Sequence, residues 1–210
     1  MKIMPELEIS NLSVQYGTSR GSVHALGNIE FRLENGESIG IAGESACGKS
    51  TLGLSVMRMI QGGKIISGKI VFDGESILEM SNSKFDKDIR WKKISMVFQG
   101  AMNSLDPVFT IEDQFDEVLK QHKFKGDSDK VIDDAVRSVN LDLSVLKKYP
   151  HELSGGMKQR IVIAMALLLK PKFVIADEPT TALDVLIQAQ IINLLKNLKK
   201  GRNVSHAYLT

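Results

Sequence analysis

One stretch of the chain constrains the fold more than any other. The apolar segment Ser38 to Ala42 predicts a short buried strand that ends at Gly43. Leu52 to Ile60 predicts a helix that stops at Gly62-Gly63. A strand that passes through a glycine-bounded loop directly into a helix is typical of α/β proteins. We therefore expect an α/β fold in which residues 43–50 form the connecting loop.

The rest of the chain continues this alternation. Residues 7–16 and 23–33 have apolar side chains at mostly alternate positions, which predicts two strands. Further strands are expected at 69–72, 94–98, 173–176 and 205–209, and further helices at 155–169 and 185–198. Alternating strands and helices favour a parallel sheet. Residues 100–152 have helical periodicity throughout, which indicates an inserted helical subdomain within a single domain whose catalytic core is 1–99 and 153–210.

Composition excludes several classes of protein. The 27 Lys and Arg residues nearly balance the 25 Asp and Glu residues, so charge does not indicate a nucleic-acid partner. Cys47 is the single cysteine, which rules out an intrachain disulfide and fits a reducing cytoplasm. The longest apolar run, Ile161 to Leu169, is far shorter than the roughly 20 residues of a membrane-spanning helix. We expect neither a membrane span nor a signal peptide.

The loop after the first predicted α/β strand fits the phosphate-loop pattern G-x-x-x-x-G-K-[ST]. Its glycines allow backbone amides to turn toward phosphates, and the following helix adds the positive end of its dipole. Lys49 would neutralise the β and γ phosphates, and the Ser50 hydroxyl would bind Mg²⁺. The predicted nucleotide-binding residues of this segment are Gly43, Glu44, Ser45, Ala46, Cys47, Gly48, Lys49, Ser50 and Thr51.

Two carboxylates follow the predicted strand at 173–176. Asp177 and Glu178 would lie at the edge where open α/β sheets bind ligands. We assign Asp177 to the metal and Glu178 to the base that deprotonates the attacking water. Taken alone, Asp-Glu after an apolar strand is more often a solvated turn, but the phosphate loop upstream reverses that preference.

A second glycine-containing segment precedes another predicted helix. Ser154 is placed as an N-cap, and Gly155 and Gly156 permit close approach of the backbone to a ligand. This arrangement predicts a second anion-binding helix N-terminus. Ordinary helix capping explains the same residues about equally well when the segment is considered alone.

Taken together, these motifs resemble the ATP-binding subunits of ABC transporters. The resemblance rests on the phosphate loop, Leu-Ser-Gly-Gly-Met-Lys-Gln-Arg at 153–160, Asp177-Glu178 and Ala182-Leu183-Asp184, and it covers essentially the whole chain. Residues 102–107 and 179–185 are similar to the oligopeptide, dipeptide and nickel importer branch. The implied fold is a P-loop NTPase core with a parallel-rich sheet, an N-terminal antiparallel β subdomain and the inserted helical subdomain.

The resemblance also implies roles for residues and partners. Gln99 would be both a catalytic residue and a ligand of the metal ion, and Tyr16 would stack on adenine. Two ATP-binding subunits would enclose ATP head to tail, so that the phosphate loop of one faces Ser154, Gly155, Gly156 and Asp184 of the other. The implied protein is a transport-coupled ATP hydrolase that uses ATP and Mg²⁺. It would act with transmembrane permease subunits, as a peripheral protein on the cytoplasmic side of the cell membrane, to import peptides or a similar small solute.

Several residues depart from the family pattern or have plainer explanations. Ala46 stands where glycine is usual, and a positive φ there would cost about 1 kcal/mol, so that glycine would tighten ATP binding. Gly100-Ala101 replaces the more usual Asp-Pro. Cys47 is expected to be a small side chain rather than a redox switch. The histidines show no metal spacing and are expected at the surface or in loops; they are His24, His122, His151 and His206.

Two alternatives to the importer subunit stay open at this point. One is a soluble ABC-type ATPase without a membrane partner, and the other is a fragment that binds nucleotide with impaired hydrolysis. In the resembling family the last strand continues past threonine into His-Asp, whereas this sequence ends at Thr210. We therefore expect a C-terminally truncated form that keeps Mg-ATP affinity but hydrolyses at least roughly tenfold more slowly.

Overall fold

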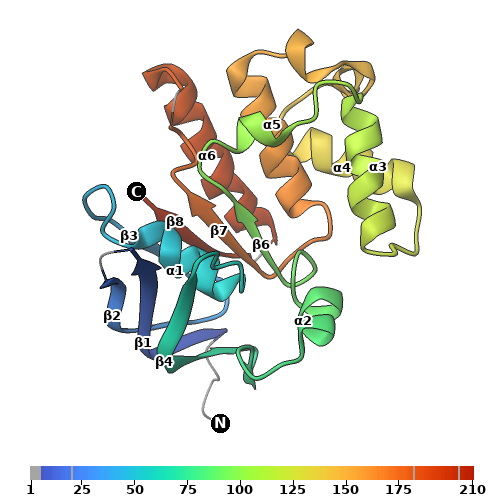
Figure 1. Cartoon of the computed structure of the whole chain (residues 1–210). Coiled ribbons are helices and arrows are strands. Elements are labelled where there is room, and N and C mark those ends of the chain that lie inside the picture. The colour runs from blue at the N-terminus through green and yellow to red at the C-terminus, as the bar shows by residue number, and fades with distance from the viewer. Residues whose placement is uncertain (1–5, 20, 182, 203) are drawn as a thin grey trace.

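The computed structural model describes residues 6–19, 21–181, 183–202 and 204–210, which form two four-stranded sheets (Figure 1). The first sheet is antiparallel and has the order β2-β1-β4-β5. Its strands are β1 (Leu7–Thr18), β2 (Gly21–Leu33), β4 (Gly63–Phe72) and β5 (Glu75–Ser76). This sheet corresponds to the antiparallel part of the expected fold.

The second sheet is parallel and confirms the arrangement predicted from alternating strands and helices. Its order is β3-β8-β7-β6, with β3 at Ser38–Ile41, β8 at Ser205–Leu209, β7 at Phe173–Asp177 and β6 at Ile94–Val97. Every residue of β6 and β7 is buried. The continuous apolar runs of these strands follow from this burial, because a parallel sheet is covered on both faces.

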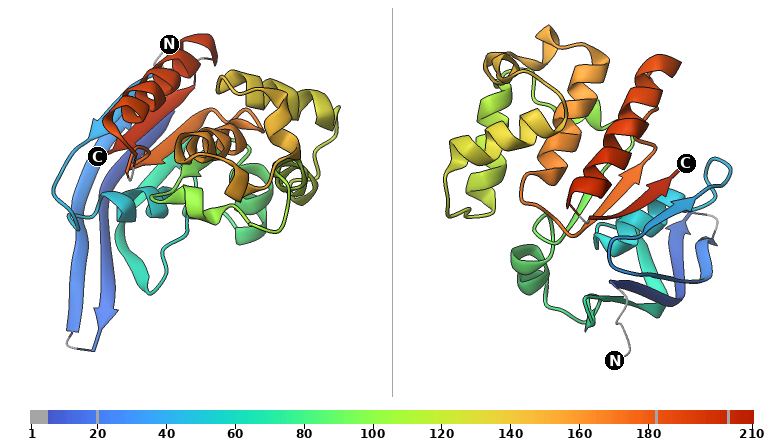
Figure 2. Two further views of the ribbon diagram at one scale, coloured as in Figure 1. Left: turned by 90° about the horizontal axis from the view of Figure 1, so that it is seen from above. Right: turned by 180° about the vertical axis from the view of Figure 1, so that it is seen from behind.

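Two hydrophobic cores lie on opposite faces of the parallel sheet. Phe173 and Ile175 of β7 point into one core together with α1 (Lys49–Val56) and the antiparallel sheet. Val174 belongs to the other core, with α5 (Gly155–Leu167) and α6 (Val185–Arg202). Alternate residues of one strand therefore stabilise two layers, as the period-two geometry of a strand requires. Figures 1 and 2 show α1 between the two sheets and α5 and α6 on the far side.

The chain between β6 and α5 is helical, as its periodicity predicts. It forms η1 (Ala101–Ser104), α3 (Ile111–Gln121), α4 (Ser128–Ser138), η2 (Leu143–Lys147) and η3 (Pro150–Glu152). A capping box starts α3: the Asp113 amide donates to the Thr110 hydroxyl at 3.2 Å, and the Thr110 amide donates to the Asp113 carboxylate at 3.1 Å. These helices pack against α5 and share its hydrophobic core.

The predicted bounds of the first helix were wrong. The structure places α1 at Lys49–Val56 instead of 52–60. The helix ends early because Arg58 adopts a left-handed conformation with φ of 53°. The Arg58 guanidinium donates to the carbonyl oxygens of Ile77 at 3.2 Å and Met80 at 2.8 Å, and these residues are distant in the sequence. Two further differences are that the strand expected at 69–72 begins at Gly63 and that the polar segment after it contains α2 (Asn82–Asp88).

The expectation that His206 lies at the surface or in a loop was also wrong. His206 is fully buried in β8, and its ring stacks on Tyr208 with the ring centroids 5.7 Å apart. The reason is topological, since β8 lies between β3 and β7 in the parallel sheet. A short segment far along the chain gives no local sign that it will be inserted between two other strands.

A buried carboxylate connects the two sheets near the start of the chain. The Glu6 residue is 3% exposed, and its carboxylate accepts a hydrogen bond from the Ser205 hydroxyl of β8. The Gly36 amide donates to the same hydroxyl oxygen at 2.8 Å. Burial raises the pKa of Glu6, the Ser205 hydrogen bond lowers it, and the nearby charges of Asp73 and Lys172 act in opposite directions.

Replacing Glu6 with glutamine is expected to stabilise the protein at neutral pH. Because the folded-state pKa is raised, folding favours the protonated acid, and this contribution is lost as pH rises through the raised pKa. Glutamine keeps an acceptor for Ser205 without the buried charge. At pH 7 the Tm of Glu6→Gln should be roughly 2–4 °C higher, the shift that about 1 kcal/mol produces in a domain of this size, and the gain should disappear near pH 4.

Glu8→Gln is the matched control for this prediction. Glu8 makes an ion pair with Arg32, whose side chain is 67% exposed, so its loss should change the free energy of unfolding little. Thermal unfolding of the wild type and both variants across this pH range measures the effect. An equal or lower Tm for Glu6→Gln at pH 7 would show that the ionised carboxylate is stabilising at this position.

Candidate active site

A cavity of about 390 Å³ lies at the carboxyl ends of the parallel strands, the edge at which open α/β sheets bind ligands. It is lined by Tyr16, Ala25, Ser45, Ala46, Gly48, Lys49, Ser50, Thr51, Gln99 and Glu178. All of these except Ala25 were predicted as site residues from the sequence. The structure thus brings together side chains from β1, the loop before α1, the end of β6 and the end of β7.

The loop between β3 and α1 has a conformation that requires glycine at one position. Gly48 has φ of 101°, and a Cβ built on it would lie 2.3 Å from the Ala25 carbonyl oxygen. Helix α1 starts immediately after Gly48 without a side-chain cap or an acidic residue in its first turn. The first amides of α1 are therefore available to an anion, which the helix dipole also favours.

The Lys49 side chain folds back over this loop. Lys49 is only 9% exposed, and its ammonium donates to the carbonyl oxygens of Gly43 at 2.6 Å and Glu44 at 2.9 Å. Among the residues that the structure describes, no carboxylate lies within ion-pair distance of Lys49. A buried cation with only neutral partners is suited to receive a phosphate group.

Asp177 and Ser50 form the part of the site that could hold Mg²⁺. Asp177 is 3% exposed; burial raises its pKa, and this is opposed by a hydrogen bond from the Ser50 side chain. The charge of Glu178 raises this pKa further, whereas that of Lys49 lowers it. The Asp177 Oδ1 atom is buried without a hydrogen-bond partner in the described part of the chain. This donor set fits Mg²⁺, which binds through one or two protein oxygens together with phosphates and water.

Glu178 is held by two neutral donors. Its Oε2 accepts hydrogen bonds from Gln99 Nε2 and from Thr181 Oγ1, each at 2.8 Å. The Glu178 backbone has φ of 44°, a conformation that is uncommon outside glycine and that tends to occur at functional sites. Neutral partners orient the carboxylate without cancelling its charge, so the geometry suits a general base.

Tyr16 closes one side of the cavity. Its hydroxyl lies 3.4 Å from the Thr51 hydroxyl, and its ring passes so close to Gly63 that a Cβ there would be 2.7 Å from the ring. The half-buried ring fits the predicted contact with adenine, which stays a prediction.

Seven predicted nucleotide contacts do not line this cavity. Three of them, Gly43, Glu44 and Cys47, belong to the phosphate loop itself, and the other four lie farther along the chain. The Ser154 hydroxyl accepts the Met157 amide at 3.3 Å and so caps α5, and the Asp184 carboxylate accepts the Ile187 amide at 3.0 Å at the start of α6. Gly156 packs so tightly on Ile187 that a Cβ would lie 2.9 Å from the Ile187 side chain. Ser154, Gly155, Gly156 and Asp184 thus form a separate cluster, and Ala182 of the same motif lies outside the described residues.

Two contributors to the site were missed by the sequence analysis. Ala25 comes from β2 and reaches the phosphate loop through its backbone carbonyl, which any residue could supply, so its side chain carries no signal. Thr181 donates its hydroxyl to Glu178 across a turn in which the Thr181 amide also donates to the Glu178 carbonyl at 3.1 Å. The Thr-Thr pair two and three residues after Glu178 is a signal that could have been used.

Ala46 has a φ of 65°. This is the positive φ at which we expected an alanine to be strained at this position. The strain is already present without nucleotide, and its relief should therefore appear mainly in stability and only secondarily in affinity. Ala46→Gly should raise the Tm by roughly 2–4 °C, the shift that about 1 kcal/mol produces in a domain of this size. Thermal unfolding checks this, with Ala189→Gly on the exposed side of α6 as a control that should lower the Tm. A lower Tm for Ala46→Gly would mean that the left-handed alanine is not strained.

Comparison with known proteins identifies the family. Residues 26–181 match the family model of the ABC transporter. The chain is 41% identical over 211 residues to the oligopeptide transport ATP-binding protein OppD of Haemophilus influenzae, covering 98% of this chain and 65% of that protein. It is 42% identical over 216 residues to the dipeptide transport ATP-binding protein DppD of Bacillus subtilis, covering 97% of this chain and 62% of that protein. The chain thus spans less than two thirds of the length of these relatives.

Solved structures agree with the family match. A dimeric structure of the ATP-binding cassette MJ0796 bound to ADP and Pi superposes with a TM-score of 0.83 at 26% identity, covering 97% of this chain and 87% of that one. The structure of cbiO1 from Clostridium perfringens, part of the ABC transporter complex cbiONQ, superposes with a TM-score of 0.81 at 30% identity. The match covers 98% of this chain and 78% of that one. With the phosphate loop, the paired carboxylates and this architecture, the chain belongs to the ABC transporter family.

Proposed function

We propose that the protein binds Mg-ATP in the cavity described above and hydrolyses it. The observation that carries the proposal is the convergence of three charged groups in and beside this cavity: the ammonium of the buried Lys49, the carboxylate of the buried Asp177 and the oriented Glu178 carboxylate. The family match supports the same conclusion, because it includes the phosphate loop and both carboxylates.

Different residues of the site would bind the phosphates and the metal ion. Lys49 would exchange its contacts with the loop carbonyls for the β and γ phosphates, where it offsets their charge. The amides at the start of α1 would bind the same phosphates. Ser50 and Asp177 would hold Mg²⁺, which neutralises charge on the phosphates when bound, and Gln99 would contribute to the same region.

Glu178 would act as the general base. Gln99 and Thr181 fix the direction of its carboxylate, which accepts a proton from the water that attacks the terminal phosphate. Gln99 lies two residues after the end of β6, and the chain after it enters the helices at 101–152. We propose that these helices form a subdomain and that Gln99 links its movement to the catalytic carboxylate.

The cluster of Ser154, Gly155, Gly156 and Asp184 would complete the nucleotide site of a second ATP-binding subunit. These residues do not line the cavity beside the phosphate loop, which supports a role toward a nucleotide held by another subunit. The dimeric MJ0796 cassette provides a precedent for pairing. The ATP-dependent partner would be a copy of this chain or a related subunit.

The relatives indicate the process that hydrolysis would drive. Those reported above are named as oligopeptide and dipeptide transport ATP-binding proteins. None of the described helices is both long and apolar enough to span a membrane. We propose a peripheral subunit on the cytoplasmic side of the cell membrane that powers import of oligopeptides, dipeptides or a similar small solute through transmembrane permease subunits. These relatives do not favour an ATPase without a membrane partner, and reduced turnover of the 210 residues alone stays a prediction.

Phosphate release from Mg-ATP, measured with and without a permease pair in vesicles, tests this function. We expect hydrolysis by the ATP-binding subunit and its stimulation by the permeases and peptide. Nucleotide binding without any hydrolysis in either setting would contradict the enzymatic part of the proposal. Hydrolysis that no peptide permease stimulates would contradict the transport part.

A further inference from the structure

We propose that Gln159 is a positioning residue that fixes the loop carrying Glu178. Gln159 lies in the first turns of α5, is 4% exposed, and donates from Nε2 to the Pro179 carbonyl oxygen at 2.7 Å. Pro179 directly follows Glu178 in the chain. The proposal rests on the proposed function, because it concerns the geometry of the general base.

The segment 178–181, called here the Glu178 loop, is held by few other contacts. The Glu178 amide donates to the Leu209 carbonyl at 2.9 Å, and the Thr181 amide closes a turn onto the Glu178 carbonyl at 3.1 Å. Gln188 Nε2 from α6 adds a longer bond of 3.3 Å to the Thr180 carbonyl. Among the described residues, the bond from Gln159 is therefore the shortest that holds a backbone carbonyl of this loop from another element.

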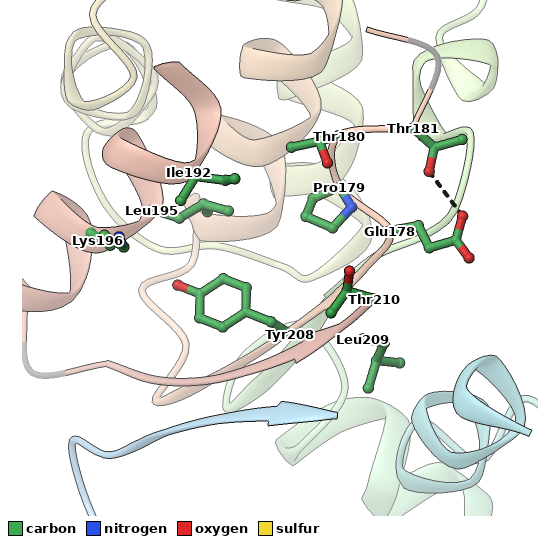
Figure 3. A pocket seen from close by; sticks show the side chains of 10 residues that line it. All are labelled: Glu178, Pro179, Thr180, Thr181, Ile192, Leu195, Lys196, Tyr208, Leu209 and Thr210. Atoms are coloured by element: carbon green, nitrogen blue, oxygen red, sulfur yellow. Dashed lines mark hydrogen bonds between the residues drawn. The ribbon is translucent and has the colours of Figure 1, made fainter. Parts of the chain in front are cut away.

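The same loop also borders a cavity. A cavity of about 400 Å³ borders Pro179, Thr180 and Thr181, and Figure 3 shows these side chains at its edge. Its opposite wall includes Ile192, Leu195 and Tyr208. Hydrogen bonds from the neighbouring helices α5 and α6 hold backbone carbonyls of this loop. A neutral amide is suited to this task, since it satisfies a buried carbonyl without burying a charge.

The position of Gln159 gives the bond a second consequence. Gln159 belongs to the same helix as Ser154, Gly155 and Gly156, which we propose to face the nucleotide of the second subunit. The Pro179 carbonyl belongs to the loop that carries the base of the chain's own site. This hydrogen bond connects the helix that would face the partner's nucleotide with the loop that carries Glu178. Closure of the helix on that nucleotide would therefore determine the position of Glu178. A small displacement of a catalytic group lowers the rate of the chemical step much more than it lowers the affinity for the substrate.

Gln159→Leu removes the donor while keeping an apolar side chain of similar size, and Gln190→Leu is its control. Gln190 is exposed on α6 and accepts from Arg160 at 2.9 Å without contacting the Glu178 loop. We expect Gln159→Leu to lower kcat for Mg-ATP at least roughly tenfold with KM changed less than about twofold. Exchange of the Thr181 amide hydrogen should become faster, whereas Gln190→Leu should change neither quantity. Wild-type kcat, or a loss of kcat matched by an equal rise in KM, would overturn the proposal.

Gln159→Glu supplies a readout that a merely structural role would not change. An ionised glutamate cannot donate to the Pro179 carbonyl, but a protonated one can, and burial favours protonation. The ratio of variant to wild-type kcat should therefore rise as pH falls from 8 to 6. A ratio independent of pH would contradict a hydrogen-bonding role. If the wild type itself does not hydrolyse Mg-ATP, the proposed function fails, while unchanged Thr181 exchange in Gln159→Leu would overturn the positioning role alone.

Discussion

Replacing Lys49 with alanine is expected to weaken Mg-ATP binding by at least about a hundredfold, or about 2.7 kcal/mol, so that binding falls below detection. Lys49 is only 9% exposed, and its ammonium has only neutral partners among the described residues. Its loss leaves the charge of the phosphates poorly compensated in a partly desolvated site. It also removes the two hydrogen bonds from Lys49 to the carbonyl oxygens of Gly43 and Glu44.

Titration calorimetry with Mg-ATP measures this effect, and Lys69→Ala controls for the loss of one positive charge. Lys69 is exposed on β4 and does not line the cavity. We expect Lys69→Ala to bind as the wild type does. Near-normal affinity of Lys49→Ala would remove the phosphate loop from the nucleotide site.

Glu178→Gln is expected to keep ATP affinity and to lose at least roughly a hundredfold in turnover, because general-base catalysis contributes about that much or more. The glutamine amide can still bond to Thr181 or Gln99 and still orient a water molecule, but it cannot accept the proton. The variant should therefore accumulate as an ATP-bound dimer, which light scattering detects.

Glu79→Gln is the matched control, since Glu79 is exposed and does not line the cavity. It should hydrolyse and dimerise as the wild type does. A Glu178→Gln variant that releases phosphate at the wild-type rate would show that another group accepts the proton.

The parts of the fold that were predicted correctly are those specified by local patterns. The apolar run at 173–176 predicts a strand because both faces of β7 are buried. The bounds of α1 were missed because Arg58 ends it through carbonyls of residues 77 and 80, and the burial of His206 was missed because β8 is inserted between β3 and β7. In each case the deciding contact joins segments that are distant in the sequence.

In the candidate site, too, the residues that could be predicted are those that a local sequence pattern specifies. Lys49, Ser50 and Asp177-Glu178 are recognisable because phosphate and metal chemistry requires these residue types at these places. Ala25 and Gln159 are not recognisable, since one acts through a backbone carbonyl and the other bonds a carbonyl of another element. The positive φ of Ala46 could be stated only as a condition until the backbone was known.

The most direct test of a Mg-ATP site at the phosphate loop is a map of amide chemical shifts as Mg-ATP is added to the protein. We predict that the largest changes fall on residues 43–51, with further changes at Tyr16 and Gln99, and that Lys49→Ala abolishes all of them. Changes at Ser154 to Gly156 should appear only under conditions in which two subunits associate. Shifts centred on the cavity beside Tyr208, or the absence of any shift at residues 43–51, would contradict the assignment of the site.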